Sequence, residues 1–239
     1  DIVEQLQGAP IPASLLESEI LPARLDDYDP GDLDAVMAAG EVVWIGIEPL
    51  GDRDGRLALF LADHQPHLLP PRPHRASDLP AREQAILAHL QGHGASFFAP
   101  LHEAAGAGYP GETVDALWNL AWRGLVTNDT LHALRAFTRS RATARRRSRP
   151  AAPSAFRSRR LVPAAAEGRW SKIADPGRGR DATRWAAAAT AQLLSRQGVV
   201  TREGVGAESI PGGFALVYPV LKAMEEAGRV RRGYFVAGL

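Results

Sequence analysis

The sequence lacks cysteine altogether: none of its 239 residues is Cys. Disulfide frameworks, thiolate metal sites and cysteine nucleophiles are therefore excluded. No apolar stretch approaches the roughly 20 residues that a membrane-spanning helix requires. Residues 1–10 have neither the basic start nor the apolar segment of a signal peptide. We therefore expect a cytoplasmic protein without a membrane partner, stabilised by packing.

Metal-ligand patterns are also missing. The seven His residues include two close pairs, His64 with His67 and His89 with His93. Neither pair belongs to an H-E-x-x-H motif or has an evident third ligand. We therefore predict no metal site, and no pattern singles out a catalytic residue.

Lysine is scarce, because Lys172 and Lys222 are the only two and Arg carries most of the positive charge. Nine Arg and no acidic residue lie in residues 139–160, RSRATARRRSRPAAPSAFRSRR. The formal net charge is +1, but without these nine Arg the remaining 19 basic and 27 acidic residues give −8. The composition of this Arg-rich segment cannot form a core, so we expect it to be disordered without a partner. It is either a solvated linker or an arm that follows DNA phosphates.

A helical pattern repeats three times along the chain. Gly40, Gly124 and Gly228 each end an apolar helical stretch, and a Val follows each Gly by two residues. A leucine precedes each Gly by seven residues and another precedes it by 34. The nearer anchors are Leu33, Leu117 and Leu221, and the distant ones are Leu6, Leu90 and Leu194. We predict that each nearer anchor is buried and that its replacement by Ala costs about 2 to 5 kcal/mol.

Each repeat has the order helix, helix, helix, β hairpin, which is typical of a winged helix. In the third copy, helices are predicted over 182–196, from the N-cap Thr201, and up to residue 227, followed by the strand-like RVRRGYFVAG. In the first copy, a hairpin runs through VVWIGIEPL, a turn over 51–55 and RLALFLADH. The predicted fold class is mainly α with small β wings (α+β), arranged as tandem winged-helix modules.

The repeats define three modules. The first, residues 1–76, is N-terminally truncated and includes a Pro-rich connector that begins at Pro66. The second, residues 77–174, carries the Arg-rich segment 139–160 as an insertion in its wing, before a returning strand over 168–173. The third, residues 175–239, is C-terminally truncated.

Five stretches carry a family resemblance: LPARL at 21–25, AAGEVVWIG at 38–46, GLVTND at 124–129, GRWS at 168–171, and GVVTREGV…PGGFALVYPVLKAMEEAGRVRRGYFVAGL at 198–239. They resemble the C-terminal region of bacterial Lhr (large helicase-related) proteins. The resemblance implies an ATP-dependent DNA helicase whose core lies far N-terminal of a winged-helix array, with ATP and Mg²⁺ as cofactors of that core. This chain has no G-x-x-x-x-G-K-[ST] phosphate loop, so we expect it to need no cofactor and to hydrolyse no ATP.

The resemblance also implies a role. We expect a non-catalytic accessory region that binds single-stranded or duplex DNA and that organises or oligomerises the helicase in DNA repair. Its partners are then DNA, the helicase core of the same polypeptide and a further copy of the chain. The alternative is a part of a DNA-glycosylase-like domain, whose catalytic carboxylate the resemblance places beyond Leu239. That alternative requires a carboxylate beside an opening wide enough for a flipped base.

Basic residues of the wings and of the insertion are the candidate DNA contacts. In the wings they are Arg169 and Lys172 of the second module and Arg231 and Arg232 of the third, with ordinary solvation as the alternative interpretation. In the insertion they are Arg145, Arg146, Arg147, Arg157, Arg159 and Arg160.

The helices that end at Gly124 and Gly228 occupy the base-reading position of a winged helix. Their polar side chains suit base reading poorly, because acidic groups such as Glu225 and Glu226 repel phosphate. We expect these helices to serve as spacers or protein-contact surfaces. The five Trp residues are expected in the core or between modules, with base stacking as the alternative; they are Trp44, Trp118, Trp122, Trp170 and Trp185.

Overall fold

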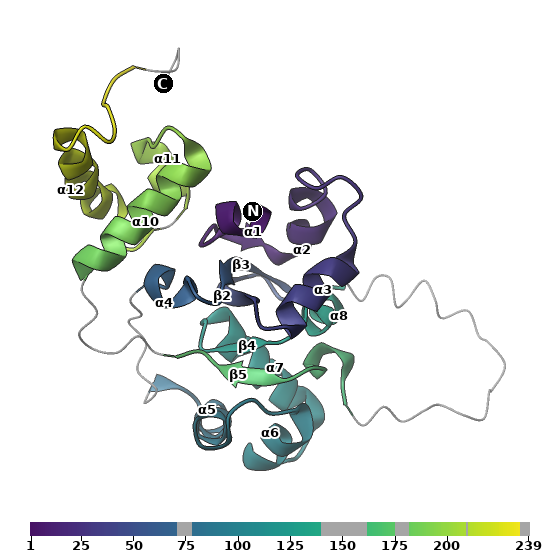
Figure 1. The fold of residues 1–239 in the computed structure, drawn as a ribbon. Helices are drawn as coiled ribbons and strands as arrows, with labels where there is room; N and C mark the ends of the chain where they lie inside the picture. Colours follow the sequence, from purple (N-terminus) through teal and green to yellow (C-terminus); the bar gives the residue numbers. More distant parts are fainter. Residues whose placement is uncertain (71–77, 140–161, 175–181, 209, 235–239) are drawn as a thin grey trace. The chain divides into compact units, whose positions relative to one another are not determined.

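The computed structural model describes residues 1–70, 78–139, 162–174, 182–208 and 210–234. The chain divides into two compact units (Figure 1). Unit 1 contains residues 1–10, 58–73 and 175–239, and unit 2 contains residues 11–57 and 74–174. In the part of the chain that is described, no helix combines the length and the apolar character that crossing a membrane demands.

The first module has the winged-helix order and one strand that the sequence did not indicate. Its helices are α1 (Ile2–Leu6), α2 (Ala13–Leu15), which continues as the π-helix η1 (Leu16–Ile20), and α3 (Pro30–Ala38). Its strands are β1 (Ile11–Pro12), β2 (Val42–Leu50) and β3 (Asp54–Leu61), in the sheet order β1-β3-β2. β1 and β3 are antiparallel, with Pro12 opposite Arg56. The short helix α4 (Gln65–Leu68) follows.

Local chemistry sets the bounds of α3 and of the hairpin. The Asp29 side chain caps α3 by accepting a 2.7 Å hydrogen bond from the Gly31 amide, and Pro30 occupies the first helical position. Gly40 follows the helix with φ +78°, the left-handed conformation of a C-terminal glycine. The hairpin turn is shorter than the predicted one, because Asp54 already belongs to β3 and its carboxylate accepts hydrogen bonds from Ser14.

The second module repeats the same order. Its helices are α5 (Ala81–His93), α6 (Phe98–Ala104) and α7 (Pro110–Trp122). Its wing strands β4 (Val126–Asn128) and β5 (Trp170–Lys172) are antiparallel, which confirms the returning strand predicted from the sequence. Ser96 forms an isolated antiparallel bridge with Trp170, in the place of β1.

Between the two strands of the second wing, two short helices pack against each other and hold the ends of the insertion together. We call this pair of helices the closed base of the wing. Helix α8 (His132–Thr138), which the sequence did not indicate, packs against the 3₁₀ helix η3 (Ala164–Ala166). The carbonyls of Ala165 and Ala166 accept hydrogen bonds from the indoles of Trp118 and Trp170, at 2.8 and 3.2 Å. All of the predicted insertion except Arg139 lies outside the described residues.

The third module has its three helices, α10 (Ala182–Gln197), α11 (Arg202–Ala207) and α12 (Gly213–Glu226), around a small core of Leu193, Val205 and Val217. Thr201 caps α11 as predicted, accepting a 3.0 Å hydrogen bond from the Gly204 amide. The strand predicted after Gly228 is not formed in the described residues 229–234. A strand needs a partner for its backbone groups, and no described residue of unit 1 pairs with this segment.

All five Trp side chains are buried, which confirms the packing interpretation. Trp44, Trp118, Trp122 and Trp170 gather in unit 2, where the rings of Trp118 and Trp44 are 6.0 Å apart and those of Trp118 and Trp170 are 5.5 Å apart. Trp185 belongs to unit 1, where its indole donates to the carbonyl of Leu68 at 3.1 Å. Base stacking on these rings is excluded in this arrangement, because their faces are covered.

The leucine anchors differ in burial. Leu33 and Leu117 are 5% and 0% exposed, as predicted, whereas Leu221 is only partly buried. The prediction for Leu221 was therefore wrong: its side chain packs only partly against the core of Leu193, Val205 and Val217, and no strand in the described residues 229–234 covers it.

This difference gives a stability prediction. Leu117→Ala is expected to lower the free energy of unfolding by about 3 to 5 kcal/mol, because it leaves a cavity in a closed core. Leu221→Ala is expected to cost about 1 kcal/mol, because water already reaches the site. Urea denaturation of the two variants measures both values. Equal losses would show that the two leucines have the same environment in solution.

Candidate nucleic-acid interface

In the contacts between described residues, the two predicted cations in the wing of the second module differ: Lys172 has no carboxylate partner, whereas Arg169 has one. Lys172 donates to the Gln91 amide oxygen at 2.8 Å, so its charge has no counter-charge in that contact. Arg169 instead pairs with Asp129, through an Nε–Oδ2 distance of 2.7 Å and a backbone hydrogen bond of 2.8 Å. Of these two predicted contacts, Lys172 is therefore the one whose charge is available to a phosphate. The six Arg predicted in the insertion, Arg145, Arg146, Arg147, Arg157, Arg159 and Arg160, lie outside the described residues.

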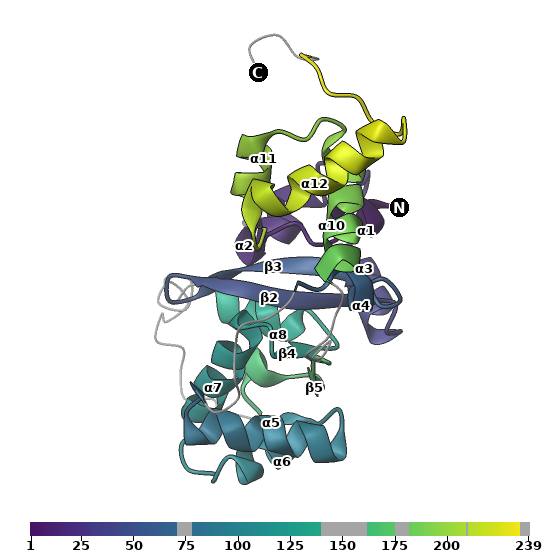
Figure 2. The same cartoon turned by 90° about the vertical axis from the view of Figure 1, so that its left-hand side faces the viewer.

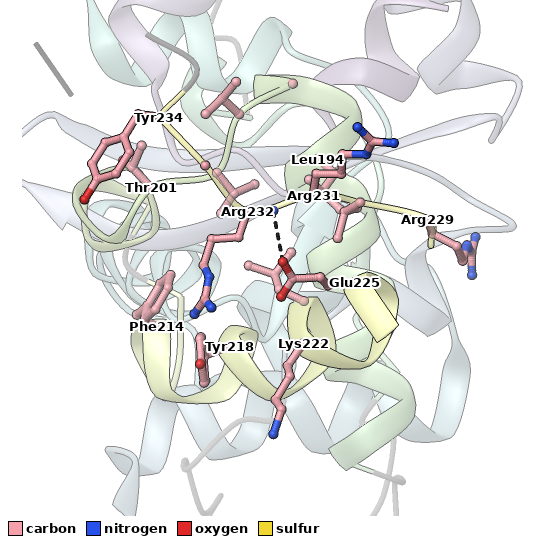
Figure 3. Close-up of a pocket in the computed structure, with 16 residues that line it drawn as sticks. Leu194, Thr201, Phe214, Tyr218, Lys222, Glu225, Arg229, Arg231, Arg232 and Tyr234 are labelled. Carbon is pink, nitrogen blue, oxygen red and sulfur yellow. Dashed lines mark hydrogen bonds between the residues drawn. The ribbon is translucent and has the colours of Figure 1, made fainter. Parts of the chain in front are cut away.

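The two cations predicted as DNA contacts in the third module line one cavity. Arg231 and Arg232 follow α12 and are exposed, and the Arg232 amide donates to Glu225 Oε1 at 3.2 Å. They line a cavity of about 660 Å³ together with Lys222 and Arg229 (Figure 3). We call this cavity the wing groove; it is lined by residues 198–201, by one face of α12 and by residues 229–234.

Aromatic side chains that the sequence reasoning missed also line the wing groove. Phe214 and Tyr218 are one helical turn apart on α12, with ring centroids 5.8 Å apart, and the Arg202 guanidinium lies 5.1 Å from the Phe214 centroid. Tyr218 is 42% exposed and Tyr234 is fully exposed. The signal available in the sequence was the i, i+4 spacing of Phe214 and Tyr218 on a helix at the base-reading position.

Helix α7 occupies the base-reading position of the second module, but most of its side chains are buried. Seven of its 13 residues are buried. A Cβ on Gly46 of β2 would lie 2.1 Å from the Ala121 carbonyl oxygen, and one on Gly55 of β3 would lie 2.5 Å from the Trp122 ring. The backbone of the first hairpin therefore lies directly on α7, and Figure 2 shows β2 above α7 and α8. This packing agrees with the interpretation of α7 as a spacer, and the role itself stays a prediction.

Helix α3, at the base-reading position of the first module, is acidic and bound to α8. Arg135 of α8 donates to both Glu17 oxygens, at 2.6 and 2.7 Å, and to Asp34 of α3 at 2.6 Å. Tyr28 donates to Glu17 Oε1 at 2.7 Å. Burial of Tyr28, together with the neighbouring Glu17 carboxylate, raises the pKa of the Tyr28 hydroxyl above its ordinary value. The pKa of the Arg135 guanidinium is raised, and its hydrogen bond with Glu17 is the main cause. This ion cluster joins the first and second modules.

The histidine pairs form no larger ligand set. The rings of His89 and His93 stack at 4.3 Å, and His64 shares a 3.0 Å hydrogen bond with Gln7. Over the described residues, no group of three or more His, Asp or Glu is placed to hold a metal ion. The absence of a metal in the protein stays a prediction.

Comparison with known proteins accounts for the repeats. Residues 1–62 match the family model for the third winged-helix domain of the large helicase-related protein, and residues 179–239 match that for the fourth. The whole chain is 42% identical over 249 residues to an Lhr helicase/probable uracil glycosylase of Mycolicibacterium smegmatis. It is 40% identical over 256 residues to an Lhr helicase/uracil glycosylase of Escherichia coli.

The chain belongs to the Lhr family of helicases. Its modules are winged-helix accessory domains of an Lhr-type helicase, as the resemblance of the sequence implied. The chain spans 16% of the length of each of these two relatives. The second module of this chain lies between the two matched segments, and its winged-helix order is seen directly in α5, α6, α7 and the strands β4 and β5.

Gly46 provides a test of the contact between the first two modules. Gly46→Ala is expected to lower the free energy of unfolding by about 3 kcal/mol or more, because its Cβ meets a backbone carbonyl that cannot move aside. Gly92→Ala is the control: Gly92 lies in α5 with open space around its Cα, so the change is expected to stabilise by about 0.5 to 1 kcal/mol. Thermal denaturation compares the two. A Gly46→Ala variant as stable as the parent chain would contradict the close approach.

Arg135 provides a second test. Arg135→Lys keeps the charge but loses the two-pronged contact with Glu17, so we expect a loss of about 1 to 3 kcal/mol in the free energy of unfolding. Arg56→Lys is the matched control, because the side chains of Arg56 and its partner Glu48 are 36% and 47% exposed and share a single contact of 2.7 Å. Urea denaturation of both variants measures the difference. Equal effects would show that the Arg135 cluster contributes no more than an ordinary surface pair.

Proposed function

We propose that this chain binds the nucleic-acid backbone, without reading bases, as an accessory region of an Lhr-type helicase. The observation that carries the proposal is that both base-reading helices of unit 2 are engaged in contacts within the protein. Seven of the 13 residues of α7 are buried, and α3 offers acidic side chains. Of the described residues predicted as contacts, Lys172, Arg231 and Arg232 remain available, and the Arg-rich segment adds its nine Arg.

Backbone binding fits the charge distribution. The nine Arg of residues 139–160 carry the positive charge of a chain whose remainder has a net charge of −8. Each phosphate that such a segment neutralises releases counterions and adds a salt-dependent increment to affinity, whatever the base sequence. We therefore assign the main contact to this segment and auxiliary contacts to the third wing.

The wider role follows from the family. Both relatives are named as helicases and as probable or assigned uracil glycosylases, which supports a setting in DNA repair. ATP and Mg²⁺ belong, in this proposal, to a helicase core outside this chain, which also makes the core of the same polypeptide a partner. Cytoplasmic location and homo-oligomerisation stay predictions.

A glycosylase activity of this chain itself is not proposed. The wing groove is lined by one carboxylate among the described residues, Glu225. Its side chain is exposed, and its Oε1 accepts a hydrogen bond from the Arg232 amide. A carboxylate that serves a flipped base needs an enclosed pocket that reads the base edge. Glu225 lacks that enclosure.

Deleting residues 139–160 tests the proposal. The deletion is expected to weaken DNA binding and to flatten the slope of log K against log salt by several units, since each lost phosphate contact removes about 0.9 for duplex and about 0.7 for single strands. The melting temperature is expected to stay almost unchanged, because α8 and η3 hold the base of the insertion. Fluorescence anisotropy over a salt series measures the affinity, and scanning calorimetry measures the melting temperature.

A charge-matched pair of variants serves as the control. Arg231→Gln with Arg232→Gln removes two charges from the third wing and is expected to reduce the slope by about one to two units. Arg24→Gln with Arg56→Gln removes two charges from unit 2 and is expected to leave the slope unchanged. A deletion variant with the parent slope would make the segment a linker. A parent chain that binds no DNA would refute the proposed function.

A further inference from the structure

Phe97 exposes an aromatic ring beside the second wing. It is 61% exposed, whereas the neighbouring Phe98 is 3% exposed and stacks on His102, with ring centroids 5.4 Å apart. Among the described residues, no other aromatic ring packs against Phe97. Phe97 therefore stands outside the aromatic packing that covers the Trp rings.

Backbone pairing fixes the place of Phe97 on the wing. Ser96 and Trp170 exchange two backbone hydrogen bonds, of 2.9 and 2.8 Å. The next pair across these antiparallel segments is Phe97 and Arg169. Side chains alternate between the two faces, and Ser96 and Trp170 occupy the buried face. Phe97 and Arg169 therefore share the outer face of the wing, where the Arg169 side chain is also exposed.

A cation lies further along the same strand. Strand β5 continues from Trp170 to Lys172, which has no carboxylate partner among the described residues. Three residues of an extended strand span about 10 Å. Phe97 is therefore one strand away from Arg169, and about 10 Å along β5 from there lies a charge that a phosphate can reach.

The Arg-rich segment returns to the wing at this same edge. Residues 139–160 are followed by the described chain from Val162, which reaches Arg169 through η3. The closed base of the wing holds this return. The last Arg of the segment is therefore nine residues from the residue opposite Phe97. A nucleic acid whose phosphates bind the segment is brought to the edge that carries this ring.

We propose that Phe97 stacks on an unpaired base of single-stranded DNA bound at the second wing. An aromatic ring beside cations is the combination with which proteins hold single strands, because every base has a π face and the backbone meets the charges. In a duplex the neighbouring base pairs cover those faces, so stacking favours single-stranded DNA without reading base edges. The inference rests on the proposed function and adds to it the preferred form of the nucleic acid.

Phe97→Ala tests the inference with an oligo(dT) strand and an abasic strand of equal length, which has the same phosphates and no bases. Loss of a stacked base is expected to weaken oligo(dT) binding at least about fivefold. The affinity for the abasic strand and the slope of log K against log salt are expected to stay unchanged, because the phosphate contacts are intact. Fluorescence anisotropy over a salt series measures all of these quantities.

Further variants separate stacking from apolar packing. Phe97→Leu keeps an apolar side chain without a π face, so it is expected to lose as much oligo(dT) affinity as Phe97→Ala. Phe97→Trp keeps a ring and is expected to retain the affinity, and oligo(dT) but not the abasic strand is expected to quench the emission of the added indole. Tyr109→Ala is the matched control, because Tyr109 is 73% exposed but lies at the start of α7, outside the wing. It is expected to change neither affinity.

The outcomes distinguish the inference from the proposed function. If the parent chain binds oligo(dT) and Phe97→Ala binds it equally well, the inference is overturned and backbone binding stands. An equal loss of affinity for the abasic strand also overturns it, because the effect then involves no base. Full oligo(dT) binding by Phe97→Leu assigns the ring to apolar packing and contradicts stacking. A parent chain that binds neither strand overturns both the inference and the proposed function.

Discussion

The approach of the first hairpin to α7 determines the character of unit 2. Gly46 has no side chain, so the backbone of β2 lies against the carbonyl of Ala121. A Cβ at this position would come within 2.1 Å of the carbonyl oxygen. This contact brings Trp44 into the same ring cluster as Trp118 and Trp122. Two modules thereby share one core, and residues 11–57 and 74–174 form one compact unit.

Sharing a core changes what a winged helix does. The fold is associated with a helix that enters the major groove, yet here α7 faces the hairpin of a neighbouring module and α3 is bound through Asp34 to Arg135. The fold alone therefore does not establish that these modules read bases. The basic side chains on which the proposed backbone binding rests lie in the wings and in the Arg-rich segment.

Local patterns were sufficient to predict the winged-helix fold. The capping glycines, the leucine anchors and the Thr201 cap depend on residues a few positions apart, so the sequence shows them directly. The Lhr resemblance was predicted on the same stretches and is confirmed. Strand β1 was missed because two residues give no alternation to recognise, and α8 was missed because it adjoins the Arg-rich segment.

Long-range contacts explain the remaining differences. Arg135 and Glu17 are 118 residues apart in the chain, and no local pattern connects them. The part of Gly46 in packing depends on a helix 75 residues later, and the exposure of Leu221 accompanies the absence of a strand in the described residues 229–234. In the candidate site, Arg231 and Arg232 were identified from their charge, but the groove beside them required the spatial arrangement of α12 and the segments on either side.

The closed base of the second wing bears on two properties, the stability of unit 2 and the length of the segment between β4 and β5. Helix α8 and η3 fix the positions at which the chain leaves β4 and returns to β5, through Trp118, Trp170 and the 2.9 Å contact between His132 and Glu167. Once both ends of a loop are held, further length adds little entropic cost, because that cost grows only with the logarithm of loop length. In the proposed function, the length and the Arg content of this segment of the Lhr wing can therefore change while the described contacts of α8 and η3 continue to hold its two ends.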